Sequence, residues 1–460
     1  MLRVLGELGG SVFQDKSMNG ILVQKYGGSS VATPEKIGAI ADRIAVCLKE
    51  NPHMVVAVSA MGKTTDQLVA LAHQVAAKPR GREMDLLLAS GEQVAVSLLG
   101  LALQERGIPA VSLTGAQCRI RTDNMFNRAL IQSIDTSRIQ DELNSGKVVI
   151  VAGFQGITGD DEVTTLGRGG GDITGAAVAA ALNARVCEIC TDVDGIYSTD
   201  PSVVPHARLL AEVSYEEAIE LATGGAKVLH PRAAEICMKY QIPIHVRSSF
   251  HMKPGTWIRG GEAMMEKAAV SAISSDKKIA KVTLLNVPDR PGIAAKVFQD
   301  LADAEINVRL IIQSAASEKL ARITFIIGAE LLDAAVELSE RWKKEGLARD
   351  VIVERDVAKI SIVGSRLAST PGIAARMFAV LAAEGINIDC ISSSEMKIAC
   401  VIAGDQLEHA VRAVHDEFFG RPEGSVEEAS GPMGERESGR GEERERGRAG
   451  QTKRPTEPRA

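Results

Sequence analysis

A lysine and a pair of glycines at the end of the first apolar run predict an anion-binding site. The segment KYGGSS (25–30) is followed by Thr33 and Pro34, which open a helix with an N-cap hydroxyl and a proline in its first turn. Backbone N–H groups and the positive end of the helix dipole would face the ligand, and the Lys25 ammonium adds a full charge. A glycine pair alone would be an ordinary turn, whereas the lysine beside it favours phosphate binding.

A second glycine-rich segment, TLGRGGGD (165–172), combines an arginine with an acid that starts a helix. Four glycines in five positions let the backbone approach a small charged ligand closely. Arg168 offers a two-pronged donor for a carboxylate, and Asp172 suits a helix cap. The alternative is a flexible hairpin with both side chains in water. The long Ala-rich helix that follows immediately makes this alternative the weaker one.

Three other segments allow more than one interpretation. AVSAMGKT (57–64) is similar to a Walker A loop, but Ala57 replaces its first glycine, so we interpret it as a ligand-facing loop and not as a P-loop. TDVDGIYSTDP (191–201) suits either a nucleoside or Mg²⁺ site or a surface loop. GGAKVLHP (224–231) offers Lys227 to a phosphate or an adenine edge, and His230 is expected to be a structural hydrogen-bonding group.

Composition excludes several classes of protein. At 460 residues the chain suggests about three domains, and 45% hydrophobic residues supply a sizeable core. The net charge of −6 and only 3% aromatic residues argue against nucleic acid as a partner. The seven scattered cysteines indicate reduced thiols, and the Cys187-x-x-Cys190 pair lacks the second pair of a zinc site. Without a signal peptide or a run of about 18 apolar residues, we expect a cytoplasmic protein with no membrane partner.

Short apolar runs alternate with helical stretches in the first half of the chain, which predicts an α/β domain with a mostly parallel sheet covered on both faces. The expected strands are 21–27, 54–60, 109–115, 147–154, 186–192 and 242–249, and the expected helices include 34–50, 64–78, 90–106 and 172–184.

The second half of the chain contains an internal repeat. Residues 287–308 align with 367–388 without a gap, and Pro-Gly-Ile-Ala-Ala recurs at 291–295 and 371–375. The order of elements in each copy predicts a ferredoxin-like module. Two such copies serve either as dimerisation sheets or as regulatory modules, and their place behind an enzyme-like domain makes regulation at least as well supported. The expected domains are an extension (1–19), a catalytic domain (20–262), two modules (263–355 and 356–420) and a disordered tail (421–460).

Seven motifs in this order resemble the aspartokinases of the amino acid kinase family: KYGGSSV, SAMGKTTD, SGE (90–92), GFQG (153–156), TTLGRGGGD, TDVDGIYSTDP and GAKVLHPRA. The resemblance covers roughly residues 20–420 and implies a three-layer αβα kinase domain followed by two βαββαβ ACT modules. It implies ATP-dependent phosphorylation of L-aspartate on its β-carboxylate, the first step of lysine, threonine and methionine biosynthesis. ATP is the co-substrate, with Mg²⁺. Lysine, threonine or both would be effectors, and the modules would join a dimeric or tetrameric homo-oligomer.

The resemblance also implies roles for individual residues. Lys25 would neutralise the transferring phosphoryl group, and Asp172 would orient lysines at the reacting centre. Ser59, Thr65, Glu92 and Arg168 would hold aspartate, with Arg168 on the α-carboxylate and Glu92 near the ammonium. The ATP site would contain Gly27, Gly28, Ser29, Thr191, Asp192, Tyr197, Asp200 and Lys227, and the effector sites Asp289, Asn307, Gln313, Asn387 and Asp389.

Three positions depart from the family pattern. Gly171 and Ile173 stand where serine and threonine are usual, which predicts lower turnover because two hydroxyls would be lost beside the phosphate. Arg309 in the first repeat replaces an acid that the second repeat keeps as Asp389. A kinase acting on glutamate or acetylglutamate, and an amino-acid sensor that has lost activity, are the alternative functions. Against the sensor, Lys25 and Asp172 are both retained.

Overall fold

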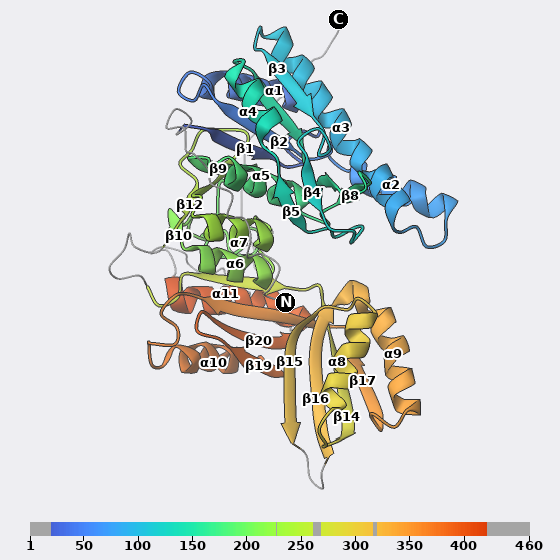
Figure 1. Ribbon diagram of the computed structural model, residues 1–460. Helices are drawn as coiled ribbons and strands as arrows, with labels where there is room; N and C mark the ends of the chain where they lie inside the picture. The colour runs from blue at the N-terminus through green and yellow to red at the C-terminus, as the bar shows by residue number, and fades with distance from the viewer. Residues whose placement is uncertain (1–19, 227, 261–267, 316–319, 421–460) are drawn as a thin grey trace, which may run out of the picture. The chain divides into compact units, whose positions relative to one another are not determined.

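The structure of the protein is a computed structural model that describes residues 20–226, 228–260, 268–315 and 320–420 (Figure 1). The expected N-terminal extension, the expected tail and Lys227 lie outside the described residues. The first half of the chain forms an eight-stranded sheet in the order β10-β12-β11-β9-β1-β2-β6-β3. Its strands are β1 (Leu22–Tyr26), β2 (Met54–Val58), β3 (Ala110–Leu113), β6 (Val148–Ala152), β9 (Val186–Thr191), β10 (Glu212–Val213), β11 (Ile244–Ser248) and β12 (Thr256–Ile258).

All strand pairs in this sheet except β11–β12 are parallel, which confirms the mostly parallel sheet. Central strands such as Met-Val-Val-Ala-Val in β2 are buried along their whole length, because helices cover both faces. The helices are α1 (Pro34–Cys47), α2 (Thr64–Val75), α3 (Arg82–Glu105), α4 (Ser137–Asn144), α5 (Gly170–Ala181), α6 (Tyr215–Gly224) and α7 (Pro231–Tyr240). Helix α3 begins eight residues earlier than the sequence predicted.

Two hydrophobic clusters fill the space between the sheet and the two helical layers. One cluster joins α1 and α3 to the sheet through residues such as Ile40 and Leu99, and the other joins α5 and α7 through residues such as Val178 and Ala234. Helix α3 is long and apolar enough to cross a membrane by length and composition, but half of its most apolar window is buried inside the protein. Such partial burial is also typical of the core helix of a soluble protein.

The two cysteines of the Cys-x-x-Cys pair lie on opposite faces of strand β9. Cys187 belongs to the cluster that contains Cys237, and Cys190 belongs to the cluster that contains Tyr26. Successive side chains of a strand alternate between its faces, so an odd spacing of three separates the two sulfurs. They cannot bind one metal ion together.

A small second sheet, which the sequence analysis did not predict, lies beside the main sheet. Its order is β5-β4-β7-β8, with β4 (Ile120–Thr122), β5 (Ile131–Ile134), β7 (Gln155–Ile157) and β8 (Val163–Thr165). It carries the turn that leads into the glycine-rich segment at 167–171.

The repeated half of the chain forms two four-stranded sheets with two helices each, as predicted. The first module contains β14 (Ile279–Pro288), α8 (Ile293–Asp303), β15 (Val308–Ala315), β16 (Leu320–Gly328), α9 (Leu332–Lys344) and β17 (Asp350–Glu354). The second contains β18 (Val357–Val363), α10 (Ile373–Ala383), β19 (Cys390–Ser393), β20 (Lys397–Ala403) and α11 (Leu407–Phe419). Phe325 and Trp342 pack edge to face in the core of the first module.

Strand β13 (Ala272–Asp276) belongs to the second module, although it precedes the first module in the chain. It pairs antiparallel with β18 and completes the order β13-β18-β20-β19. The first module is therefore inserted into the second, whereas the sequence analysis placed 263–355 wholly in the first. The physical reason is that β18 would otherwise expose an edge, since the described chain after α11 supplies no strand corresponding to β17.

The insertion predicts which module depends on β13. Ile273 is buried in the core of the second module, so Ile273→Asp places an unpaired carboxylate there and should selectively destabilise that module. Hydrogen exchange should show faster amide exchange over 357–419 than in the wild type, with 279–354 unchanged. Val353→Asp on β17 is the matched variant for the first module. Faster exchange in the first module after Ile273→Asp would contradict this assignment.

Candidate active site

The loops that follow β1, β2 and β6 meet at one edge of the main sheet. The Gly62 N–H donates to the Gly28 carbonyl at 2.9 Å, and the Gly153 N–H donates to the Val58 carbonyl at 2.9 Å. Because the strands are parallel, their carboxyl ends share this edge, where α/β proteins commonly bind ligands. The loops after β1 and β2 are tightly packed at Gly28, where a β-carbon would lie 2.7 Å from the Ala60 carbonyl oxygen.

Lys25 and Asp172 form an ion pair at this edge. The Lys25 Nζ lies 2.6 Å from Asp172 Oδ1, and each side chain is only 11% exposed. The second carboxylate oxygen of Asp172 accepts the backbone N–H of His230 at 3.0 Å. The carboxylate also stands in the first turn of α5, where the helix dipole favours negative charge. Asp172 therefore has a fixed position beside the lysine, and its expected role in orienting Lys25 stays a prediction.

Gly171 leaves room for Ser59 and Lys25. A β-carbon at position 171 would lie 2.3 Å from Ser59 Oγ and 3.1 Å from Lys25 Cε, so a side chain there would require Ser59 to move. Gly171, the first departure from the family pattern, thus lies beside Ser59 and Lys25, and its expected effect on turnover stays a prediction. Ile173 instead packs against Ala129 and Leu166 in a small hydrophobic cluster. The structure therefore does not support the expectation that a hydroxyl is missing beside the phosphate at position 173.

Glu92 presents a buried carboxylate oxygen beside the loop after β2. Its Oε1 accepts the Ala60 N–H at 3.0 Å, whereas Oε2 has no partner among the described residues. Burial raises the pKa of Glu92 to about 7, against the opposing effect of the Ala60 hydrogen bond. A buried, unpaired oxygen is suited to the ammonium group of a ligand, because the ligand supplies the missing partner.

Thr65 and Arg168 lie farther into solvent. Thr65 is half-buried in the first turn of α2, and the Arg168 side chain is 94% exposed, with Nη1 3.9 Å from Asp66 Oδ1. The structure brings Lys25, Ser59 and Asp172 together but does not bring Arg168 to them. The expected contact of Arg168 with a carboxylate stays a prediction.

Most residues expected at ATP lie on the loops after β1 and β9. Gly27 borders the Lys25 ammonium, since a β-carbon there would lie 3.4 Å from Nζ. Thr191 donates to Asp192 at 3.1 Å, and Tyr197 is half-buried. Ser29 is exposed, and its carbonyl accepts the Lys36 ammonium at 2.9 Å.

Among the described residues, the side chain of Asp200 contacts only a residue close to it in the sequence. Its Oδ1 accepts the Ser202 N–H at 2.9 Å and the Ser202 hydroxyl at 2.7 Å, the arrangement of a turn. His230 is structural, as expected: its ring nitrogen accepts the Arg232 N–H at 3.2 Å and caps α7.

Two positioning residues escaped the sequence analysis. Buried Asp85 accepts the N–H groups of Asn127 and Thr165, and Arg232 donates to the carbonyls of Leu166 and Ala129 at 3.0 and 3.1 Å. Both hold the strand end that leads into the segment with Arg168. Asp85 stands among other charged residues at the start of a long apolar helix and gives no distinct sequence signal, whereas Arg232 lies within the GAKVLHPRA motif.

Comparison with known proteins identifies the family of the chain. The chain matches the amino acid kinase family over residues 20–248, and ACT domains over 281–338 and 360–418. It is 47% identical to Aspartokinase 2 of Bacillus subtilis over 87% of this chain and 98% of that protein. The chain belongs to the aspartokinase family.

Two solved structures share the fold with 27% identity, and each is matched over 87% of this chain and 100% of its own length. E. coli aspartokinase III in complex with aspartate and ADP has a TM-score of 0.73. The same enzyme in complex with lysine and aspartate has a TM-score of 0.66. The αβα kinase domain and the pair of ACT modules are thereby confirmed.

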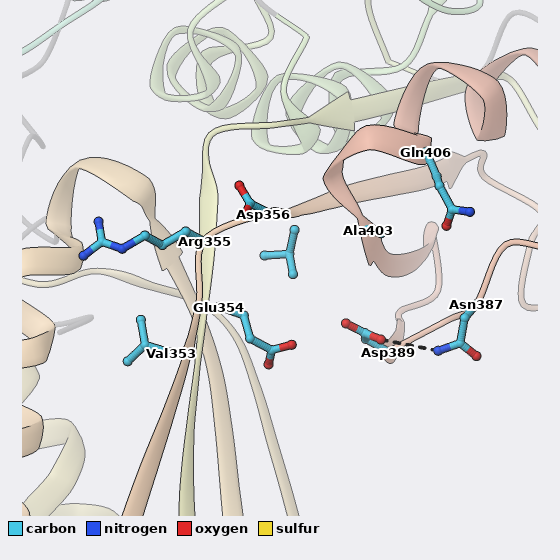
Figure 2. Close-up of a pocket in the computed structure, with 9 residues that line it drawn as sticks. Val353, Glu354, Arg355, Asp356, Asn387, Asp389, Ala403 and Gln406 are labelled. Atoms are coloured by element: carbon cyan, nitrogen blue, oxygen red, sulfur yellow. Dashed lines mark hydrogen bonds between the residues drawn. The ribbon is translucent and has the colours of Figure 1, made fainter.

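A cavity of about 540 Å³ lies between the two ACT modules. Glu354 and Asp389 both line it, and Figure 2 shows Asn387 beside Asp389 and Gln406 above them. Asn387 and Asp389 are the two second-repeat residues expected to bind an effector. The residues expected from the first repeat, Asp289, Asn307 and Gln313, do not line this cavity, so their roles stay predictions.

Arg309 is engaged by an acid. Its guanidinium donates to Asp276 on β13. Arg309 stands where an acid is usual in the first repeat. Its positive charge is thus balanced by a carboxylate on the edge strand of the second module.

The buried position of Glu92 predicts a pH-dependent affinity for aspartate. Only the ionised carboxylate attracts an ammonium, so the KM for aspartate should rise about tenfold from pH 8 to pH 6, as Glu92 is protonated below its pKa of about 7. Initial rates across this range would measure it, with the KM for ATP as the internal control. Glu92→Gln should raise the KM for aspartate and abolish its pH dependence. A constant wild-type KM would remove Glu92 from the aspartate site.

Proposed function

We propose that the chain transfers the γ-phosphoryl group of ATP to the β-carboxylate of L-aspartate and so forms 4-phospho-L-aspartate. The observation that carries this proposal is the Lys25 ammonium, which Asp172 holds at the edge of the sheet beside Ser59. Aspartate and ADP are the ligands named for the E. coli relative of the same fold.

The residue types suit a reaction that needs no general base. A carboxylate with a pKa of about 4 is already ionised at neutral pH and attacks directly. The protein must hold two anions together and neutralise the charge that develops on the phosphoryl oxygens. Lys25 supplies that charge, Glu92 receives the substrate ammonium, and the close-packed loops at Gly28 and Gly153 exclude water. Mg²⁺, entering with the ATP phosphates, would add further charge neutralisation.

Regulation would act through the ACT modules. Lysine is named as a ligand of E. coli aspartokinase III in its T-state, which supports an amino-acid effector, lysine or threonine, for this chain. The reaction would then be the controlled first step of lysine, threonine and methionine biosynthesis. We also propose that the chain works in the cytoplasm as a homo-oligomer joined through its ACT modules.

One assay separates this function from its rivals. ATP-dependent hydroxamate formation should occur with aspartate as acceptor and not with glutamate or acetylglutamate. Product from another acceptor would show that the chain is an amino acid kinase with a different substrate. No product from any acceptor would indicate an amino-acid sensor.

The charge of Lys25 should matter most in the transition state. Lys25→Ala should reduce kcat a hundredfold or more, about 2.7–4 kcal/mol, as for other groups that neutralise developing charge. Because the substitution leaves Asp172 unpaired and mostly buried, Lys25→Ala/Asp172→Asn is the control for folding, monitored by thermal unfolding. A single variant that folds and retains more than a tenth of the wild-type kcat would show that Lys25 has another role.

A further inference from the structure

The two ACT modules place a lysine at the same structural position. The sequences are Ala-Lys-Val-Thr (280–283) in β14 and Ala-Lys-Ile-Ser (358–361) in β18. Lys281 is paired across the sheet with Glu354 of β17, and Lys359 is paired in the same way with Asp276 of β13. Each module therefore begins with a lysine facing an acid on the neighbouring edge strand.

The ion pairs at these equivalent positions differ. The Lys281 Nζ lies 2.7 Å from Glu354 Oε2 and 3.1 Å from Asp389 Oδ2, so one ammonium joins two carboxylates. In the second module, Asp276 instead pairs with Arg309 from the first module. Lys359 makes no ion pair within the described part of the chain, although it is only 6% exposed. Burial lowers the pKa of Lys359 to about 8, and the nearby Lys397 adds to this effect.

The two carboxylates that hold Lys281, those of Glu354 and Asp389, both belong to the lining of the cavity (Figure 2). Burial opposes the charge on Lys281, but its bonds to Glu354 and Asp389 raise its pKa, so the ammonium stays charged. Among the described residues, the remaining oxygen of Asp389 has only a long contact of 3.5 Å with the Asn387 amide. Glu354 and Asp389 together carry two negative charges, and Lys281 carries one positive charge. One net negative charge is therefore left for a ligand.

The other charged groups of the cavity leave this count unchanged. Arg355 extends away from the two carboxylates (Figure 2), and its guanidinium lies 3.4 Å from Asp333. Asp356 is exposed, so water and salt screen its charge. Gln406 lines the cavity at the N-cap of α11, where an amide and a helix N-terminus favour a carboxylate.

We propose that Lys281 acts as a built-in side-chain ammonium, so that the cavity selects an amino acid with one ammonium and an uncharged side chain over a dibasic amino acid. The ligand's α-ammonium would meet Asp389, and its α-carboxylate would meet Gln406 and the start of α11. A second ammonium would find its carboxylates already neutralised and would be repelled by Lys281. This inference rests on the proposed regulation by amino acids and specifies its ligand class.

Isothermal titration of the full chain with L-threonine, L-methionine and L-lysine tests the proposal. The wild type should bind threonine or methionine more tightly than lysine. Lys281→Met frees one carboxylate, so its Kd for lysine should fall at least tenfold and lysine should become the preferred ligand. Lys359→Met is the matched control, with the same substitution at the equivalent position and no carboxylate pair, and should keep the wild-type preference. Asp389→Asn added to Lys281→Met should abolish the gain.

Several outcomes would overturn the proposal. These are a wild type that prefers lysine, a wild type that binds none of the three amino acids, and a Lys281→Met variant whose preference stays within twofold of wild type. A change of preference in Lys359→Met as large as that in Lys281→Met would overturn it too. Hydroxamate formation from aspartate, measured in the same preparations, reports on the proposed catalytic function separately from these binding constants.

Discussion

The ion pair between Lys25 and Asp172 constrains the rest of the kinase domain. It joins the end of the central strand β1 to the first turn of α5, so the sheet order and the packing of α5 must both be correct before it can form. A mostly buried pair loses hydration on both sides and is useful only when its geometry is fixed. Gly175 contributes to that geometry, since a β-carbon there would lie 3.0 Å from the Lys25 β-carbon. The absence of a side chain at Gly175 thus allows α5 to pack closely against Lys25.

The loop that follows β9 belongs to the kinase domain and also packs against the second ACT module. It carries Tyr197 and Asp200, which are expected at ATP, yet Val204 from the same loop is buried in the hydrophobic core of the second ACT module. Ser198 Oγ lies 2.9 Å from Nε2 of His415 on α11. The same helix begins next to Gln406, which lines the cavity between the ACT modules. Helix α11 therefore connects the cavity to the loop that carries Tyr197 and Asp200 by direct contacts.

Sequence reasoning recovered the features that depend on long, uniform patterns. Fully apolar strands such as β2 and β6, the capped start of α1 and the repeated modules all have strong local signals. It missed strands of three or four residues, such as β4 and β7, because so short a run shows no period. It also misplaced β13, since its partner β18 begins 85 residues after β13 begins and only the folded chain reveals the pairing. In the site, Lys25 and Asp172 stood in glycine-rich motifs, whereas buried Asp85 had no signal at all.

The repeated modules show how one pattern can carry two electrostatic designs. The apolar residues that form the two cores recur, because each core needs the same packing of two helices on four strands. The charged positions have no such constraint, and the replacement of an acid by Arg309 at the position equivalent to Asp389 reverses the local balance. One module then holds its lysine between two carboxylates, and the other leaves its lysine without an ion pair in the described structure. The two repeats therefore share a fold but not their ion pairs, because core packing constrains the apolar residues and leaves the charged residues free to differ.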